Sequence, residues 1–122
     1  NLANRIDPAK EMNLVCAGTV VEGKIRGQGS FRVDGKVIGD ISASENLAVG
    51  VTGEIEGNVS AKNVTVGGKI RGSISAQEKV VFEGKSVIRG DIRAAKLIID
   101  EGSIFDGRVS MAEKSPLYEV RH

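Results

Sequence analysis

The sequence predicts an all-β fold, namely a single-domain parallel β-helix (a solenoid) with about six coils of roughly 17 residues each. Two observations lead to this prediction. The composition favours strands over helices, and one short module that contains glycine recurs six times along the chain.

The composition excludes an all-α domain. The 122 residues, enough for one domain, include 15 Val and 12 Ile but only 5 Leu, together with 16 Gly. β-Branched side chains are restricted in helices and pack well on a pleated sheet. Because each glycine in a helix interior would cost about 1 kcal/mol, the chain is predicted to consist of strands.

The repeated module has the pattern apolar–x–Gly–x–aliphatic, which the middle four copies extend by x–Ala. Successive module glycines are 15 to 18 residues apart: Gly23, Gly39, Gly57, Gly72, Gly90 and Gly107. A second apolar pair follows each of the first five copies: Phe31/Val33, Leu47/Val49, Val64/Val66, Val80/Phe82 and Leu97/Ile99. Six such copies indicate a repeat architecture.

Each repeat is best explained as one coil of a solenoid. Alternating apolar and polar residues predict short strands with one buried face, and glycines permit the corners between them. No helical segment is present to cross back over a sheet. Parallel stacking of six coils at ~4.8 Å would give a prism roughly 29 Å long with a continuous apolar core.

Charges on the predicted outer surface agree with this stacking. Residues that flank the module glycine fall beside their equivalents in the next coil. One of these neighbouring pairs, Arg71/Arg89, has like charges and is repulsive. Four pairs have opposite charges: Lys24/Asp40, Glu56/Arg71, Arg89/Asp106 and Asp91/Arg108. Exposed pairs of this kind contribute about 0.2–1 kcal/mol each, so they define the register more than they stabilise it.

The coil is predicted to be right-handed, because parallel crossover connections almost always are. A left-handed β-helix is the alternative, since it runs on six-residue repeats. Six apolar residues do recur at that interval: Val64, Ile70, Ala76, Phe82, Ile88 and Ala94. The spacing of the module glycines breaks the six-residue register, which favours the right-handed form.

We expect the β-helix domain to cover residues 15–111, between two flexible tails at residues 1–14 and 112–122. Pro8 and Pro116 bracket the repeats. No proline interrupts them, as hydrogen bonding between coils requires.

The sequence predicts no catalytic, cofactor-binding or metal-binding residues. The net charge of +1 and the scarcity of aromatic residues argue against nucleic-acid binding. Gly84-Lys85-Ser86 ends like a phosphate-binding loop, but Lys79 stands where that motif needs its first glycine, so no nucleotide site is expected. Cys16 is the only cysteine, which excludes an internal disulfide, and no apolar run is long enough to cross a membrane.

The two ends of the solenoid are the predicted functional site, because they expose unpaired strand edges and an open core. In the last copy the alanine position becomes Met111, and the apolar column that starts at Val21 ends at Phe105. Phe31, in the first coil, occupies a column otherwise held by Leu and Val. We hypothesise that Phe105, Met111, Phe31 and Val21 form a polymerisation interface that propagates as a filament. The alternative is an internal cap, in which these side chains fold over their own core.

Residues from about 14 to 111 resemble the bactofilins, a bacterial family of polymer-forming cytoskeletal proteins. The resemblance rests on residues 18–23 (GTVVEG), residues 31–37 (FRVDGKV) and the repeated Gly-x-[Ile/Val]-x-Ala. It implies a right-handed, roughly triangular β-helix that assembles with itself, without nucleotide, through the solenoid ends. It also implies a cytoplasmic scaffold for cell-shape or envelope-associated machinery at the inner face of the cytoplasmic membrane, with partner proteins bound through the tails. Family members often carry a short apolar N-terminal segment that targets the membrane, and residues 1–13 show none, so membrane contact would need a segment missing here.

Two other functions stay open from the residues alone. An acyltransferase of the left-handed β-helix type would need a basic residue, usually His, in a cleft between subunits. The only histidine is His122, the last residue. A non-polymerising adaptor module would instead bind its partners through the two tails.

Overall fold

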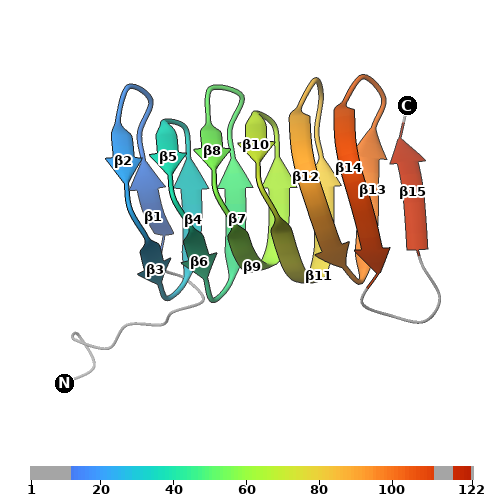
Figure 1. Ribbon diagram of the computed structural model, residues 1–122, viewed down its shortest axis with the longest axis horizontal. Coiled ribbons are helices and arrows are strands. Elements are labelled where there is room, and N and C mark those ends of the chain that lie inside the picture. Colours follow the sequence, from blue (N-terminus) through green and yellow to red (C-terminus); the bar gives the residue numbers. More distant parts are fainter. Residues whose placement is uncertain (1–11, 112–116, 122) are drawn as a thin grey trace.

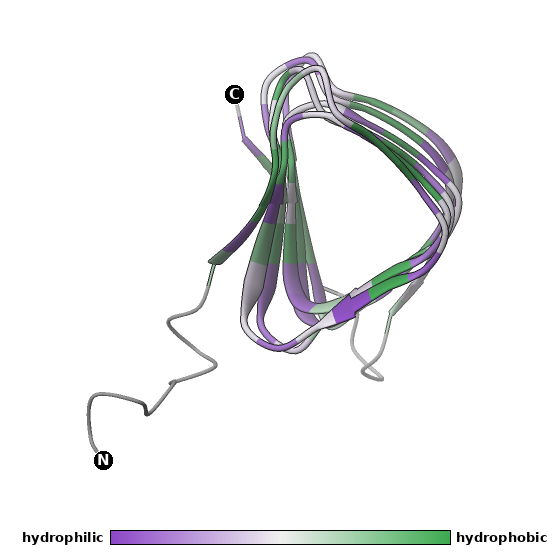
Figure 2. Ribbon diagram, turned by 90° about the vertical axis from the view of Figure 1, so that its left-hand side faces the viewer, coloured by the Kyte–Doolittle hydropathy of each residue, from purple (hydrophilic) through white to green (hydrophobic). Residues whose placement is uncertain are grey.

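The computed structural model describes residues 12–111 and 117–121 of the chain. Every regular element in this part is a strand, and every strand pair is parallel, within one continuous sheet that winds into a coil (Figure 1). The predicted parallel β-helix is therefore confirmed. Viewed along its axis, the coil has a three-sided outline (Figure 2).

Three faces make up this outline. The first face consists of β1 (Met12–Val15), β4 (Ser30–Val33), β7 (Asn46–Val49), the ends of β9 (Val59–Val66) and β11 (Ile74–Phe82), β13 (Lys96–Asp100) and β15 (Leu117–Arg121). The second face consists of β2 (Val20–Glu22), β5 (Lys36–Ile38), β8 (Glu54–Glu56), β10 (Lys69–Arg71) and the starts of β12 (Val87–Ala94) and β14 (Ile104–Met111). The third face consists of β3 (Ile25–Gly27), β6 (Ile41–Ala43), the starts of β9 and β11 and the ends of β12 and β14.

The coil is right-handed, as predicted. In Figure 1 the near strands β12 and β14 descend, the far strands β13 and β15 ascend, and the path advances from left to right. The left-handed alternative is therefore wrong. The six-residue interval that suggested it arises because successive faces each contribute one of these buried residues in turn: Val64, Ile70, Ala76, Phe82, Ile88 and Ala94.

Apolar residues that point inward stack in columns through the core. On the second face the predicted column is in register along its whole length: Val21, Val37, Ile55, Ile70, Ile88 and Phe105. Its four middle members are at most 1% exposed. Each fully buried aliphatic side chain contributes about 1.5–3 kcal/mol, so the core columns are the main apolar stabilisation of the stack.

A column of glycines forms the corner between the second and third faces. Gly39, Gly57, Gly72, Gly90 and Gly107 all have positive φ, between 138° and 159°. A Cβ added to any of them would lie within 2.0 Å of the carbonyl oxygen of the glycine one coil earlier. The corner therefore requires glycine for two reasons: its positive φ, and the close approach of successive coils, which leaves no space for a Cβ.

The charged columns lie in the predicted register. Arg71 neighbours Glu56, and Arg89 neighbours Asp106, on adjacent coils. The second of these pairs forms an ion pair of 3.3 Å between Arg89 Nη1 and Asp106 Oδ2. The like-charged neighbours Arg71 and Arg89 also stand opposite each other, as the sequence predicted.

Both expected tails contain regular structure. Residues 12–14, assigned to the N-terminal tail, form most of β1, and Leu117–Arg121, assigned to the C-terminal tail, form β15. β15 pairs with the edge of β13, whose backbone groups would otherwise stay unpaired. The remaining residues of the two tails, including both prolines, lie outside the described residues.

Substitution of one stacked glycine is expected to disrupt the coil. Gly72→Ala places a Cβ 2.0 Å from the carbonyl oxygen of Gly57 and should cost more than about 4 kcal/mol of unfolding free energy. Gly23→Ala is the matched control, because its φ is also positive but nothing lies within 4 Å of its Cβ. The control should cost only about 1–2 kcal/mol. Urea unfolding measures both, and equal losses would contradict close backbone stacking.

Candidate assembly interface

Both ends of the solenoid present strands with one free edge. At the N-terminal end, within the part of the chain that the structure describes, β1, β2 and β3 each pair only with the following coil, through β4, β5 and β6. At the C-terminal end, among the described residues, β14 pairs only with β12 and β15 pairs only with β13. Each end therefore offers a row of backbone N–H and C=O groups to which a further strand can bond.

Large exposed apolar side chains concentrate on these same strands. Seven large apolar residues are exposed in the described part of the chain, and five belong to terminal strands. They are Met12 (58%), Leu14 (62%) and Val20 (59%) at the N-terminal end, and Ile104 (53%) and Val120 (57%) at the C-terminal end. Such clustering is typical of an interaction surface rather than of scattered surface residues.

The open core at each end adds half-buried residues to this surface. Val21 and Ile25 close the core at the N-terminal end, and Phe105 and Val109 close it at the C-terminal end. Val120 continues the inward column of Ile99, yet it is more than half exposed because no described coil stacks on it. Each end is thus an incomplete core that a second apolar surface could complete.

Three of the four predicted interface residues lie at these ends. Val21 is on the outermost strand of the second face, and Phe105 and Met111 are on β14, in register with Ile88 and Ala94. The Phe105 ring packs on Phe82 with its centroid 5.7 Å away and a tilt of 56°. One side of Phe105 therefore contacts its own core, while part of the residue remains exposed.

Phe31 does not belong to the terminal surface, so its assignment is corrected. Strand β1 stacks outside β4, with Asn13 in register with Phe31, and Phe31 is only 6% exposed. Its ring also fills the space beside Gly27, where an added Cβ would lie 2.8 Å from the ring. The large residue at this position seals the core one coil inside the end.

Sequence reasoning missed most of the exposed end residues. Met12 and Leu14 were assigned to a tail, although alternation in Met12-Asn13-Leu14-Val15 is a strand pattern. Val120 was also missed. The available signal was the spacing of Tyr118 and Val120, which matches the apolar pair Leu97/Ile99 of the preceding coil.

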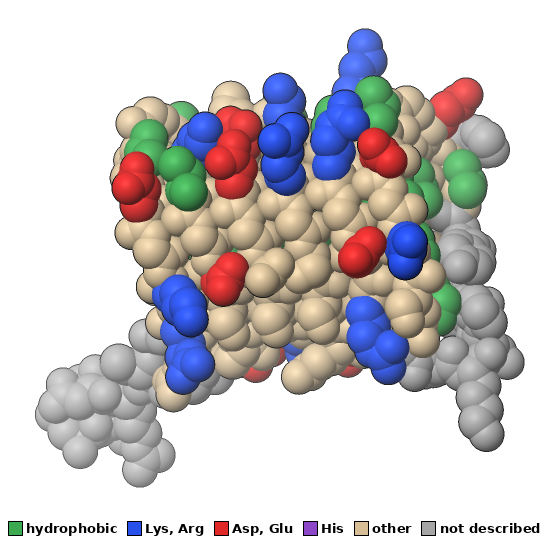
Figure 3. All heavy atoms as spheres, in the orientation of Figure 1, with side chains coloured by type: hydrophobic (Ala, Val, Ile, Leu, Met, Phe, Trp, Pro, Cys, Tyr) green, Lys and Arg blue, Asp and Glu red, His purple; other side chains and the backbone are tan. Residues whose placement is uncertain are grey.

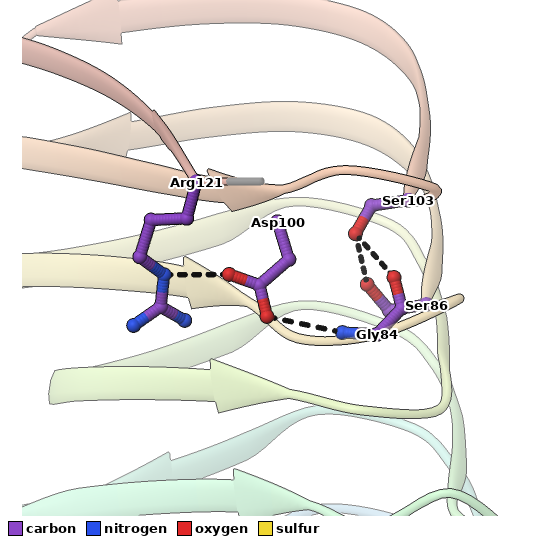
Figure 4. A network of polar contacts seen from close by, with 5 residues as sticks. All are labelled: Gly84, Ser86, Asp100, Ser103 and Arg121. Atoms are coloured by element: carbon purple, nitrogen blue, oxygen red, sulfur yellow. Dashed lines mark hydrogen bonds and ion pairs between the residues drawn. The ribbon is translucent and has the colours of Figure 1, made fainter.

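A polar network holds β15 in place at the C-terminal end (Figure 4). Arg121 Nε donates to Asp100 Oδ1 at 2.5 Å, and the other oxygen of Asp100 accepts the Gly84 N–H at 3.3 Å. Beside it, Ser103 Oγ donates to the Gly84 carbonyl at 3.0 Å and lies 3.3 Å from Ser86 Oγ. The network joins the last strand to the two preceding turns on this side.

The same network accounts for the segment that resembles a phosphate-binding loop. Gly84 and Lys85 form the turn between β11 and β12, and Ser86 is fully buried with its hydroxyl near Ser103. The glycine–lysine–serine sequence therefore forms the turn that leads into β12, and a strand rather than a helix follows it.

The described residues contain no assembled metal site. No three His, Cys, Asp or Glu side chains among them come together as ligands, and every buried side-chain N or O atom in this part has a hydrogen-bond partner. No helix in the described segments has the length and apolarity needed to cross a membrane. His122, the only histidine, lies outside the described residues.

Comparison with known proteins places this architecture in a family. Residues 13–110 match the bactofilin family model, which is described as polymer-forming cytoskeletal. Bactofilin BacP of Myxococcus xanthus (strain DK1622) is 36% identical over 97 residues, which cover 80% of this chain but only 40% of BacP. Bactofilin BacO of the same organism is 33% identical over 101 residues, 83% of this chain and 80% of BacO.

A solved structure agrees with these sequence matches. The cytoskeletal bactofilin BacA, determined by solid-state NMR, has a TM-score of 0.75 at 35% identity. The match covers 84% of this chain and 98% of that chain. The fold, the solenoid register and the sequence relatives together show that this chain belongs to the bactofilin family of polymer-forming cytoskeletal proteins.

Proposed function

We propose that this protein is a structural component that assembles with itself, without nucleotide, into filaments through end-to-end contacts of its β-helices. One observation carries the proposal: the terminal strands combine free backbone edges with most of the exposed large apolar side chains of the described chain. Bonding of a second copy at an end would pair the free backbone edges and cover the half-buried core residues there, as one coil does for the next. Because an end-to-end contact does not close on itself, it propagates.

The proposal includes a cellular role. Filaments of this kind would serve as a non-enzymatic scaffold for cell-shape or envelope-associated machinery on the cytoplasmic side of the inner membrane. Partner proteins would bind through the segments that flank the solenoid. Family membership supports the cytoskeletal part of this role, and the spacing of copies along a filament would order whatever those segments bind.

A charge placed at the C-terminal end should block assembly. Phe105→Arg puts a guanidinium group into the apolar joint, where burial without a partner costs about 3 kcal/mol or more and raises the critical concentration about 100-fold. Negative-stain electron microscopy and sedimentation without nucleotide should show short oligomers in place of filaments.

The control for this variant is Val51→Arg. Val51 is an exposed apolar residue on a turn away from both ends, so the same chemical change there should leave filaments intact. Long filaments from Phe105→Arg would show that the joint lies elsewhere.

Two alanine substitutions distinguish whether Phe105 forms an assembly joint or an internal cap. Phe82 is fully buried, and Phe82→Ala should cost about 3–5 kcal/mol of unfolding free energy in the unassembled protein. Phe105 keeps part of its surface exposed, so Phe105→Ala should cost clearly less than Phe82→Ala, measured by urea unfolding below the assembly concentration. If both substitutions destabilise the monomer equally, Phe105 is a cap and the proposed joint is wrong.

A further inference from the structure

The second face of the solenoid carries an ordered pattern of charge. Each of its three-residue stretches points its middle residue inward and its two outer residues into solvent. Figure 3 shows acidic and basic side chains side by side in a band along the upper part of the molecule, where Figure 1 places these strands. The order in which acidic and basic residues follow one another along the solenoid axis, rather than the net charge of the face, shows how a second copy could bind.

The two middle coils carry opposite charges at both outward positions. Glu54 and Glu56 project from β8, and Lys69 and Arg71 project from β10, with each acid in register with one base. Glu56 also lies 3.8 Å from Lys36 on the preceding coil. Within the described part of the chain, Lys69 and Arg71 form no ion pair within 4.0 Å, and both side chains are exposed.

This pattern is complementary to itself when the two copies are antiparallel. We number the coils by their second-face strands, so that β2, β5, β8, β10, β12 and β14 belong to coils one to six. Consider two copies that face each other through their second faces. A twofold axis relates them; it runs parallel to the strands and passes between the third coil (β8) and the fourth coil (β10). The solenoids are then antiparallel, and Glu54 faces Lys69 while Glu56 faces Arg71, twice over. In the parallel arrangement without an axial shift each coil faces its own equivalent, so that acids meet acids and bases meet bases.

The outer coils agree with the same axis. The first coil of one copy faces the sixth coil of the other, so the exposed Val20 meets the exposed Ile104. Glu22 faces Asp106, but Asp106 already forms an ion pair with Arg89, which offsets this repulsion. The second coil faces the fifth without any pair of like charges.

We propose that the second face is a lateral docking surface for a second copy of this chain in antiparallel orientation. This inference rests on the proposed function. The face measures roughly 29 Å by 10 Å, or about 300 Å² per copy, well below the roughly 800 Å² per partner of a stable interface. A single pair of molecules would therefore bind weakly, whereas two filaments gain one contact per subunit. The surface thus joins antiparallel filaments into bundles.

Charge reversal tests the surface and its symmetry. The acid-to-base variant carries Glu54→Lys and Glu56→Lys, and the base-to-acid variant carries Lys69→Glu and Arg71→Glu. Each variant alone repels its own copies across the twofold axis, so electron microscopy should show single filaments instead of bundles. A 1:1 mixture of filaments assembled separately, and the protein with all four substitutions, should both restore bundles.

Two controls accompany these variants. Glu78→Lys with Glu83→Lys makes the same change in net charge as the acid-to-base variant, but outside the second face, and it should leave bundling unchanged. Bundles of the wild-type protein should also disperse in about 1 M salt, where the Debye length is about 3 Å. Low-speed sedimentation collects bundles, and high-speed sedimentation collects single filaments as well.

The results distinguish a failure of the lateral surface from a failure of the end-to-end joint. Filaments that never bundle in low salt, reversal variants that bundle like the wild type, or a mixture that fails to restore bundles would each overturn the lateral surface while leaving end-to-end assembly intact. A wild-type protein that forms no filaments would overturn the proposed function and, with it, the filament contact described here.

Discussion

Close contact between backbones at one corner underlies the whole solenoid. At the glycine column each coil lies against the carbonyl group of the previous coil, at a distance that leaves no space for a Cβ. The same corner donates a hydrogen bond to the next coil, such as the bond from the Gly72 N–H to the Arg89 carbonyl at 2.9 Å. Strand spacing is therefore set here, and the parallel ladders on all three faces follow from it.

Because this constraint repeats, most of the fold could be predicted from the sequence. Every inner coil has a neighbour on both sides, so its glycine, its inward aliphatic residue and its alanine all recur at fixed places in the module. The column from Val21 to Phe105 and the charge pair Arg89/Asp106 followed from that recurrence and were confirmed.

The ends could not be predicted as well, because a terminal coil has only one neighbour. Its residues must fit against one adjacent coil instead of two, so they follow the repeat pattern less closely. β15 begins 21 positions after the equivalent residue of β13, beyond the period of 15 to 18 residues that separates the module glycines. Phe31 was misplaced for a related reason: it departs from its column like a terminal residue, yet β1 covers it.

The proposed joint between copies uses the same interactions that join coil to coil. Backbone groups on β1, β2, β3, β14 and β15 and the half-buried residues Val21 and Phe105 are what an inner coil would present to its neighbour. The regular faces between the ends serve a different purpose. They repeat charge at coil spacing, and on the second face the order of the signs provides a contact that depends on orientation.

X-ray fibre diffraction from oriented filaments tests the central claim most directly. If solenoids stack end to end, their strands run across the filament and the coil spacing runs along it, so a reflection at about 4.8 Å should appear on the meridian. A 4.8 Å reflection confined to the equator would mean that the solenoids lie across the filament. That result would contradict assembly through the solenoid ends.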